Sequence, residues 1–322
     1  MAQWQVVTNS IRYLNRSAFG CLCCGSSELR REATVISPFL AKRCWNGKPE
    51  LTWVMFCGQC DFRFYDRGLS DEEASRYYGS YRDETYLRER HRFEPFYTKR
   101  EHEKLEMWLS CRDRRLALNQ VLRKAGAPES FEAALDFGGG TGKMLLDIDA
   151  KRRAVFDVSV GQLEKGLAGI TSHAELGGDW DLVLSCQVLE HLTDPFSSVV
   201  TIANTMPEGG WFYAEVPPQH WSNPARNGPA RNAWLRWIVD KPRLLLAADI
   251  VSTAFRIKGG FLPPLGFIPM REHLNYFTVE ALCALLTRAG FRIEWSGRNS
   301  LDCICAVGTR SASVRQQETT AA

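Results

Sequence analysis

An acidic residue and alternating glycines follow an apolar run in "EAALDFGGGTG", where Asp136 precedes Gly138, Gly140 and Gly142. Glycine lets a ligand approach the backbone closely at the point where a strand turns into a helix. Asp157 ends the next predicted strand, where a carboxylate can bind ribose hydroxyls. This spacing predicts a nucleotide-binding turn, and a glycine-rich turn that binds no ligand is the alternative.

The charge beside this turn favours one class of nucleotide. Dinucleotide-binding turns read Gly-x-Gly-x-x-Gly and hold a diphosphate, whereas this turn reads Gly-x-Gly-x-Gly after Asp136. A carboxylate suits a cationic ligand better than a diphosphate. S-adenosylmethionine carries a sulfonium and an ammonium and no phosphate. We therefore expect S-adenosylmethionine here rather than a dinucleotide.

Two Cys-x2-Cys pairs stand near the N-terminus, Cys21 with Cys24 and Cys57 with Cys60. Four thiolates with this spacing predict a structural zinc ion, which would help to fold a segment too small to bury a core. A closed four-thiolate site has no open position, so we expect no metal catalysis. A redox pair or unrelated buried thiols are the alternatives, and Cys23 is left over.

The composition is that of an ordinary globular protein, with 45% hydrophobic and 24% charged residues. The net charge of +3 gives no indication of a nucleic-acid partner, which is therefore not expected. The N-terminal stretch lacks the pattern of a signal peptide, and the sequence holds no apolar run long enough to span a membrane. The sequence thus predicts a cytoplasmic location.

Residue patterns divide the chain into segments. A small β-rich zinc module is predicted over 18–66, followed by a helical linker over 67–130 that covers the cofactor. Strands alternate with helices over 131–310, which predicts an α/β domain with a parallel sheet. Residues 218–271 interrupt that alternation as an insertion, and the polar tail 311–322 is predicted to be disordered.

Capping residues mark the starts of three predicted helices. Ser70 with Glu73 has the spacing of a capping box. Asp194 stands directly before Pro195, a favoured order of N-cap and first helical residue. Thr278 precedes an apolar run with helical periodicity. A helix is therefore expected to begin after each of these caps.

Residues 131–309 resemble class I S-adenosylmethionine-dependent methyltransferases, and within them the small-molecule branch with a V-L-E-H-L-x-D-P segment. The similarity rests on five blocks in order, "ALDFGGGTG", "VFDVS", "DWDLVLSCQVLEHLTDP", "MPEGGWFYAEVP" and "REHLNYFTVEALCALLTRAGF". It implies a seven-stranded, mostly parallel Rossmann-like sheet. It also implies that Asp136 and the three glycines contact the methionyl part of the cofactor, and that Asp157 contacts the ribose.

The resemblance implies further cofactor contacts. The family places an acidic residue near the adenine, between the third and fourth strands. Here that segment reads "GITSHAELGG", with His173 or Glu175 at the corresponding point. Cys186, at the tip of the fourth strand, is counted with the cofactor-binding residues on the same grounds.

The cysteine pairs, together with the tyrosine-rich "RYYGSYRDETY" over 76–86, make the chain similar to sugar C-methyltransferases. This implies methyl transfer to a small hydroxylated acceptor, such as a sugar nucleotide or a glycan intermediate. In those enzymes a Glu-His pair lies at the substrate, which carries over to Glu272 and His273, with Tyr276 close by. Histidine is the usual base near neutral pH. We expect His273 as the base and His191 as the second candidate.

Other interpretations remain open at this point. The insertion, with Trp221, Trp234 and Trp237, is predicted to form a helical lid over the acceptor, or else an interfacial helix that contacts a membrane surface. An RNA methyltransferase with a zinc ribbon and a non-catalytic cofactor-binding scaffold are the other functional hypotheses. A divalent-metal site of the type Glu-x-x-Glu-His is not expected, because Gln187 occupies the first glutamate position.

Overall fold

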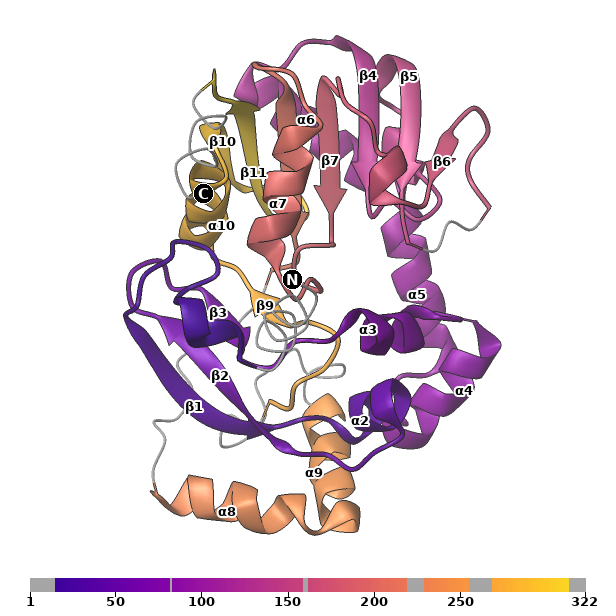
Figure 1. Cartoon of the computed structure of the whole chain (residues 1–322). Coiled ribbons are helices and arrows are strands. Elements are labelled where there is room, and N and C mark those ends of the chain that lie inside the picture. The colour runs from indigo at the N-terminus through magenta and orange to yellow at the C-terminus, as the bar shows by residue number, and fades with distance from the viewer. Residues whose placement is uncertain (1–14, 82, 159–161, 219–228, 255–267, 313–322) are drawn as a thin grey trace.

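The computed structural model describes residues 15–81, 83–158, 162–218, 229–254 and 268–312 (Figure 1). Its strands are β1 Leu29–Val35, β2 Leu51–Cys57, β3 Arg63–Tyr65, β4 Ser130–Phe137, β5 Asp149–Phe156, β6 Ala168–Ile170, β7 Leu182–Cys186, β8 Trp211–Val216, β9 Asn275–Tyr276, β10 Phe291–Arg298 and β11 Ile304–Arg310. Its α-helices are α2 Pro38–Trp45, α3 Asp71–Tyr78, α4 Glu84–Phe93, α5 Lys99–Ser110, α6 Arg112–Ala125, α7 Pro195–Asn204, α8 Pro229–Val239, α9 Pro242–Ala254 and α10 Val279–Arg288. Short 3-10 turns are η1 Arg16–Phe19, η2 Lys143–Leu145 and η3 His173–Glu175.

Seven strands form one sheet in the order β10-β11-β8-β7-β4-β5-β6. The pairs of β4 with β5, β4 with β7, β5 with β6 and β7 with β8 are parallel, whereas β11 runs antiparallel to both of its neighbours. The hairpin of β10 and β11 closes one edge. The predicted seven-stranded, mostly parallel sheet is therefore confirmed.

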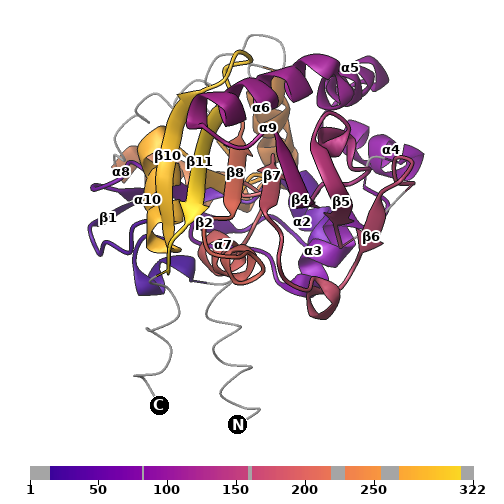
Figure 2. The same cartoon turned by 90° about the horizontal axis from the view of Figure 1, so that it is seen from above.

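Helices cover the two faces of this sheet (Figure 2). Side chains alternate between the faces of a strand, so in β4 Leu135 packs with α7 and α10, while Ala134 packs with α6. The three predicted caps are confirmed as well. The capping box before α3 is complete, and the caps before α7 and α10 each accept a backbone hydrogen bond.

The N-terminal segment contributes to a second sheet, in the order β1-β2-β3-β9. Its last strand comes from the other end of the chain, because Asn275 and Tyr276 pair with β3 in antiparallel register. The ring of Phe62 also packs against Phe277 at a centroid distance of 4.8 Å. The segment expected over 18–66 as a separate module therefore shares its sheet with the segment before α10.

The insertion is helical, as expected, but α8 and α9 do not form a lid in the described part of the chain. Leu235, Ile238 and Leu245 pack on Ala33 and Val35 of the small sheet, and none of the described insertion residues after residue 217 and before 272 lines the large cleft. An apolar sheet face offers these side chains more burial than an open cleft would.

Residues 219–228 and 255–267 of the insertion, with Trp221, lie outside the described residues, as does the tail from residue 313. Among the described helices, none has the length and apolarity required to cross a membrane.

Candidate active site

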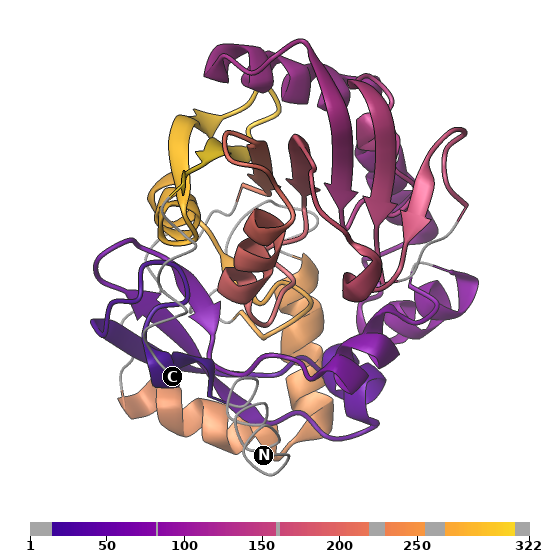
Figure 3. The ribbon, with the colours of Figure 1, turned by 45° about the horizontal axis from the view of Figure 1, so that its top comes forward.

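A cleft of about 1430 Å³ lies at the carboxyl ends of β4, β5 and β7. In Figure 3 these strand ends point toward the helices that precede the large sheet in sequence. The cleft wall also includes residues of α3 and α5, the turn that follows β7, and the loop before β9. Ligands bind at this edge in open α/β sheets because loop residues converge there.

The cleft brings together most of the site residues that the sequence predicts. Those that line it are Asp136, Gly138, Gly140, Asp157, Cys186, His191, Glu272 and His273, together with His173. Those that do not line it are Gly142, Glu175 and Tyr276.

The glycine turn forms an open cradle at the tip of β4. Gly140 has a φ of +55° and its amide donates to the Asp157 carboxylate at 3.0 Å. Open space surrounds the position where a Cβ of Gly140 would stand, whereas a Cβ on Gly139 would approach the carboxylate of Asp136 to 2.3 Å. The backbone of this turn is therefore accessible from the cleft, and the turn leaves room for the Asp136 side chain.

Asp136 is a buried carboxylic acid that faces the turn. Asp136 is only 1% exposed, and its Oδ2 has no hydrogen-bond partner among the described residues. Burial raises the pKa of Asp136 to about 7, with Asp157 adding to the shift and Arg114 opposing it. A carboxyl group in this state gains most from a cationic ligand that enters the cradle.

The segment after β6 presents His173 to the cleft. The His173 ring packs edge-on against Phe156 with centroids 4.7 Å apart, and both residues line the cleft next to Asp157. Glu175 lies two residues further on and does not reach the lining. Of the two positions left open for the adenine contact, the structure brings His173 to the cleft.

Glu190, His191 and His273 form a second group of residues on the cleft wall. Their potential ligand or proton-accepting atoms lie within 4.8 Å of one another, and the two imidazole rings are 4.7 Å apart at an interplanar angle of 80°. The His191 Nδ1 donates to the carbonyl oxygen of Glu272 at 3.0 Å. In the neutral imidazole this leaves the lone pair on Nε2, which lies 3.8 Å from the Glu190 carboxylate.

Glu190 was not predicted from the sequence, although it stands in the recognised "VLEHL" segment. It is 1% exposed, its Oε2 has no hydrogen-bond partner among the described residues, and burial raises its pKa to about 8. A carboxyl group with this pKa can exchange a proton near neutral pH. The group of three can also surround a cation, but Gln187 does not join it, since its amide donates to Glu215 at 3.0 Å.

Glu272 is held by a chain of buried charges. Arg90 of α4 contacts Glu272 at 3.2 Å and Glu94 at 2.7 Å, and Arg271 pairs with Glu94 and with Asp249 of α9. Burial acts to raise the pKa of Glu272, but Arg90 and His273 outweigh it and hold that pKa below its usual range. Glu272 is therefore an ionised anchor for the loop that carries His273.

Tyr276 lies in β9, away from the cleft. It is only 6% exposed, and its hydroxyl is 3.4 Å from the hydroxyl of Tyr65. Three other tyrosines line the cleft, Tyr78, Tyr81 and Tyr97. The Tyr78 ring packs edge-on against His191 with centroids 6.1 Å apart. The tyrosine-rich stretch over 76–86 was the sequence signal for Tyr78 and Tyr81.

A family model described as a methyltransferase domain matches residues 108–295, a span that contains the glycine turn and both histidines. The chain belongs to this family. A comparison with curated proteins finds no match.

The fold of this methyltransferase is similar to solved structures of low identity. A Mesorhizobium loti S-adenosylmethionine-dependent methyltransferase is 21% identical, with 60% of this chain and 98% of that chain covered and a TM-score of 0.37. A Burkholderia thailandensis 1,6-didemethyltoxoflavin-N1-methyltransferase is 15% identical, with 65% and 83% covered and a TM-score of 0.40. A human N-acetylserotonin methyltransferase is 16% identical, with 73% and 58% covered and a TM-score of 0.40.

The enzyme is an S-adenosylmethionine-dependent methyltransferase, and its cradle fits that cofactor. The unpartnered oxygen of buried Asp136 suits a cationic group, and the open backbone at Gly140 suits close approach. The Asp157 carboxylate, which already accepts from the Gly140 amide, stands at the end of β5 where a ribose would be bound. Bound cofactor supplies an activated methyl group.

The four cysteines of the methyltransferase form a site that can hold a structural zinc ion. Their sulfur atoms all lie within 4.8 Å of one another. The Sγ atoms of Cys21 and Cys60 are 3.6 Å apart, and those of Cys24 and Cys57 are 3.5 Å apart. A tetrahedron with zinc–sulfur bonds of about 2.3 Å has edges of about 3.8 Å, so a small adjustment would close the site.

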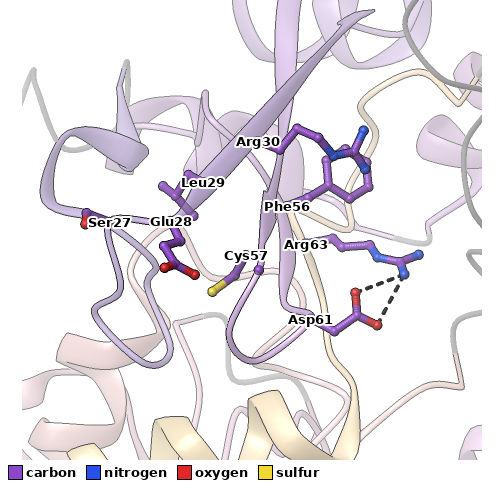
Figure 4. Close-up of a pocket in the computed structure, with 9 residues that line it drawn as sticks. Ser27, Glu28, Leu29, Arg30, Phe56, Cys57, Asp61 and Arg63 are labelled. Carbon is purple, nitrogen blue, oxygen red and sulfur yellow. Dashed lines mark hydrogen bonds and ion pairs between the residues drawn. The ribbon is translucent and has the colours of Figure 1, made fainter.

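A shallower hollow of about 650 Å³ borders this cysteine cluster (Figure 4). Arg30 and Arg63 flank the ring of Phe56, with guanidinium carbons 4.4 and 5.7 Å from its centroid, and Arg63 also pairs with Asp61. The hollow lies on the small sheet and shares no lining residue with the large cleft. Its two arginines thus already contact Phe56 and Asp61, and the hollow is separate from the active site.

Proposed function

We propose that this methyltransferase transfers the methyl group of S-adenosylmethionine to a small hydroxylated acceptor, a sugar nucleotide or a glycan intermediate. The observation that carries the proposal is the group of Glu190, His191 and His273, which shares one cleft with the glycine turn. Because the cofactor brings its own leaving group, the protein must align the acceptor and remove its proton.

In this proposal His273 takes the proton from the acceptor hydroxyl. The loop that bears it is fixed through Glu272, which Arg90 holds at 3.2 Å. His191 is oriented by its bond to the Glu272 carbonyl and stands beside His273. The Glu190 carboxyl group lies 3.8 Å from Nε2 of His191, and because burial raises its pKa to about 8 it can exchange a proton there near neutral pH.

The remaining lining supports a hydroxylated acceptor. Aromatic rings and hydroxyls from α3, the turn after it and α7 line the same cleft as the histidines, among them Tyr78, Tyr81, Ser197 and Thr201. Sugars are bound by such combinations, since hydroxyls exchange hydrogen bonds with ring hydroxyls and aromatic faces cover the C–H surface. This lining supports a polar acceptor of small size.

RNA as the acceptor is the second candidate, and the charge of the cleft disfavours it. Acidic side chains line the cleft near α3 and α7, including Asp71, Glu72 and Asp194. Nucleic-acid sites are lined by a surplus of Lys and Arg, because phosphate contacts supply most of the affinity. A non-catalytic scaffold remains the third hypothesis.

The test is a methyl-transfer assay with labelled cofactor and a panel of sugar nucleotides. We expect labelled sugar with the wild-type enzyme and a loss of rate of about 10² to 10⁴-fold in His273→Asn. His91→Asn is the matched control, because His91 is an exposed residue of α4 outside the cleft lining, and it should keep the wild-type rate.

Three results would overturn the proposal. Label in total RNA but in no sugar would identify RNA as the acceptor. Normal cofactor binding with no product from any acceptor would favour the scaffold. An unchanged rate in His273→Asn would remove this residue as the base and direct attention to His191.

A further inference from the structure

The outer surface of the insertion carries apolar side chains in regular spacing. Trp237 of α8 is 52% exposed, and Leu244 and Val251 of α9 are 48% and 51% exposed. Leu244, Ala247 and Val251 share one helix face, since they recur at helical spacing and all are exposed. We call these exposed apolar residues of the two consecutive helices the hairpin surface.

Positive charges flank the hairpin surface at the turn that joins the two helices. Arg236, Lys241 and Arg243 are exposed and form no ion pair with another described residue, and Asp240 is the single acid between them. Basic residues beside exposed tryptophan and leucine are typical of surfaces that rest in the headgroup region of a bilayer.

The opposite side of the same helices is firmly packed. Leu235 and Ile238 of α8 and Leu245 of α9 are buried against the small sheet, and Figure 1 shows α8 on the side of that sheet remote from the seven-stranded sheet. Asp249 of α9 pairs with Arg271. The hairpin surface is therefore the outward face of a fixed element, not a loosely attached helix.

We propose that the hairpin surface docks the methyltransferase on an anionic lipid bilayer. The exposed apolar side chains would enter the headgroup region while the three cations pair with lipid phosphates. A second copy of the chain is disfavoured as the occupant, because the surface offers one acid, Asp240, for three cations, so a self-contact would bring an excess of positive charge together. The proposal concerns binding alone and does not depend on which acceptor the enzyme methylates.

Vesicle co-sedimentation of the full chain tests this. We expect binding to vesicles of phosphatidylglycerol mixed with phosphatidylcholine, little binding to phosphatidylcholine alone, and weakening as salt rises. The double variant Trp237→Ala, Leu244→Ala should lower the partition coefficient about tenfold or more. The triple variant Arg236→Gln, Lys241→Gln, Arg243→Gln should remove the preference for anionic vesicles.

The matched control is Leu116→Ala with Arg123→Gln on α6, which removes an exposed leucine and an exposed cation elsewhere on the surface. This variant should bind vesicles like the wild type. Thermal unfolding of each variant checks that it is folded. Absence of vesicle binding by the folded wild-type chain overturns the proposal. A wild-type dimer in ultracentrifugation that Trp237→Ala dissociates would instead assign the surface to self-association.

Discussion

Arg16 joins three segments of the methyltransferase, two of which carry the histidines, and its removal gives the sharpest test of how the histidines are held. The residue is 2% exposed. Its guanidinium donates to the carbonyls of Tyr65 and Thr193 at 2.8 Å each and to the side chain of Asn275 at 2.5 Å. A further bond reaches the carbonyl of Leu192 at 3.3 Å. Arg16 thus ties the residues that follow His191 to β3 and β9.

The substitution Arg16→Met is expected to lower the free energy of unfolding by about 3–5 kcal/mol. Hydrogen bonds from a charged donor contribute about 1.5–3 kcal/mol each, and Arg16 makes three short ones. The cost of burying the cation offsets part of this sum, as its pKa shows, since burial lowers that pKa to about 9. The net loss is close to the value for breaking a buried charged network.

The expected effect on catalysis separates positioning from general damage. The cofactor cradle lies on β4 and β5, whereas Arg16 contacts the segments that carry His191 and His273. We expect kcat to fall about 10 to 100-fold, because misplaced reacting groups lose rate steeply, while cofactor affinity stays within about twofold. Arg16→Lys keeps the charge without the planar fork and should be intermediate.

Thermal and urea unfolding, cofactor titration and steady-state kinetics are the assays. Arg123→Met is the control, because Arg123 is an exposed residue of α6 and surface changes usually alter stability by less than about 0.5 kcal/mol. If Arg16→Met loses less than about 1 kcal/mol of stability and keeps the wild-type kcat, the reasoning is refuted. Equal losses in cofactor affinity and kcat would point to unfolding rather than misplacement.

Other predictions follow from the same structure. Burial raises the pKa of Asp136 to about 7, and a cation binds its ionised form, so cofactor affinity should fall as the pH drops below 7. Calorimetry should show a weaker pH dependence of this affinity in Asp136→Asn. An identical pH dependence in the variant would contradict the prediction. Cys57→Ser should release bound zinc and destabilise the small sheet, measured by metal analysis and by proteolysis; unchanged zinc content would count against the four-thiolate site. Arg114→Met breaks a buried pair with Glu215 at 2.5 Å and should cost about 3–5 kcal/mol, whereas Arg115→Met, whose partner is the exposed Asp147, should cost about 1 kcal/mol or less; similar losses in a urea titration would show that burial does not decide the difference.

Local patterns in the sequence were enough to predict the α/β sheet, its cofactor turn and the cysteine site. The sheet and the turn depend on residues close in sequence, and so does each cysteine pair, although the two pairs come from different segments. In β4, successive side chains pack against different helix layers, and their apolar types indicate a buried strand. The glycines after Asp136 indicate a turn whose backbone is open to a ligand. Cysteine pairs report a metal site because few other uses need that spacing.

The active-site group depended on contacts that no local pattern encodes. The sequence singled out His191 and His273, but only the tertiary structure places their rings side by side. Glu190 is a buried acid in the same structure. The same holds for Arg90, whose role arises because α4 packs against the loop that carries Glu272. A sequence contains no periodic signal for a contact between residues that lie 182 positions apart.

The sequence by itself determined which elements form, because strand alternation, caps and glycine turns act through the chain's own neighbouring atoms. Only the tertiary structure decided that β9 completes the N-terminal sheet and that α8 and α9 pack behind that sheet. These outcomes depend on which apolar surfaces fit one another across the whole molecule, and burial free energy is gained only when both surfaces are present.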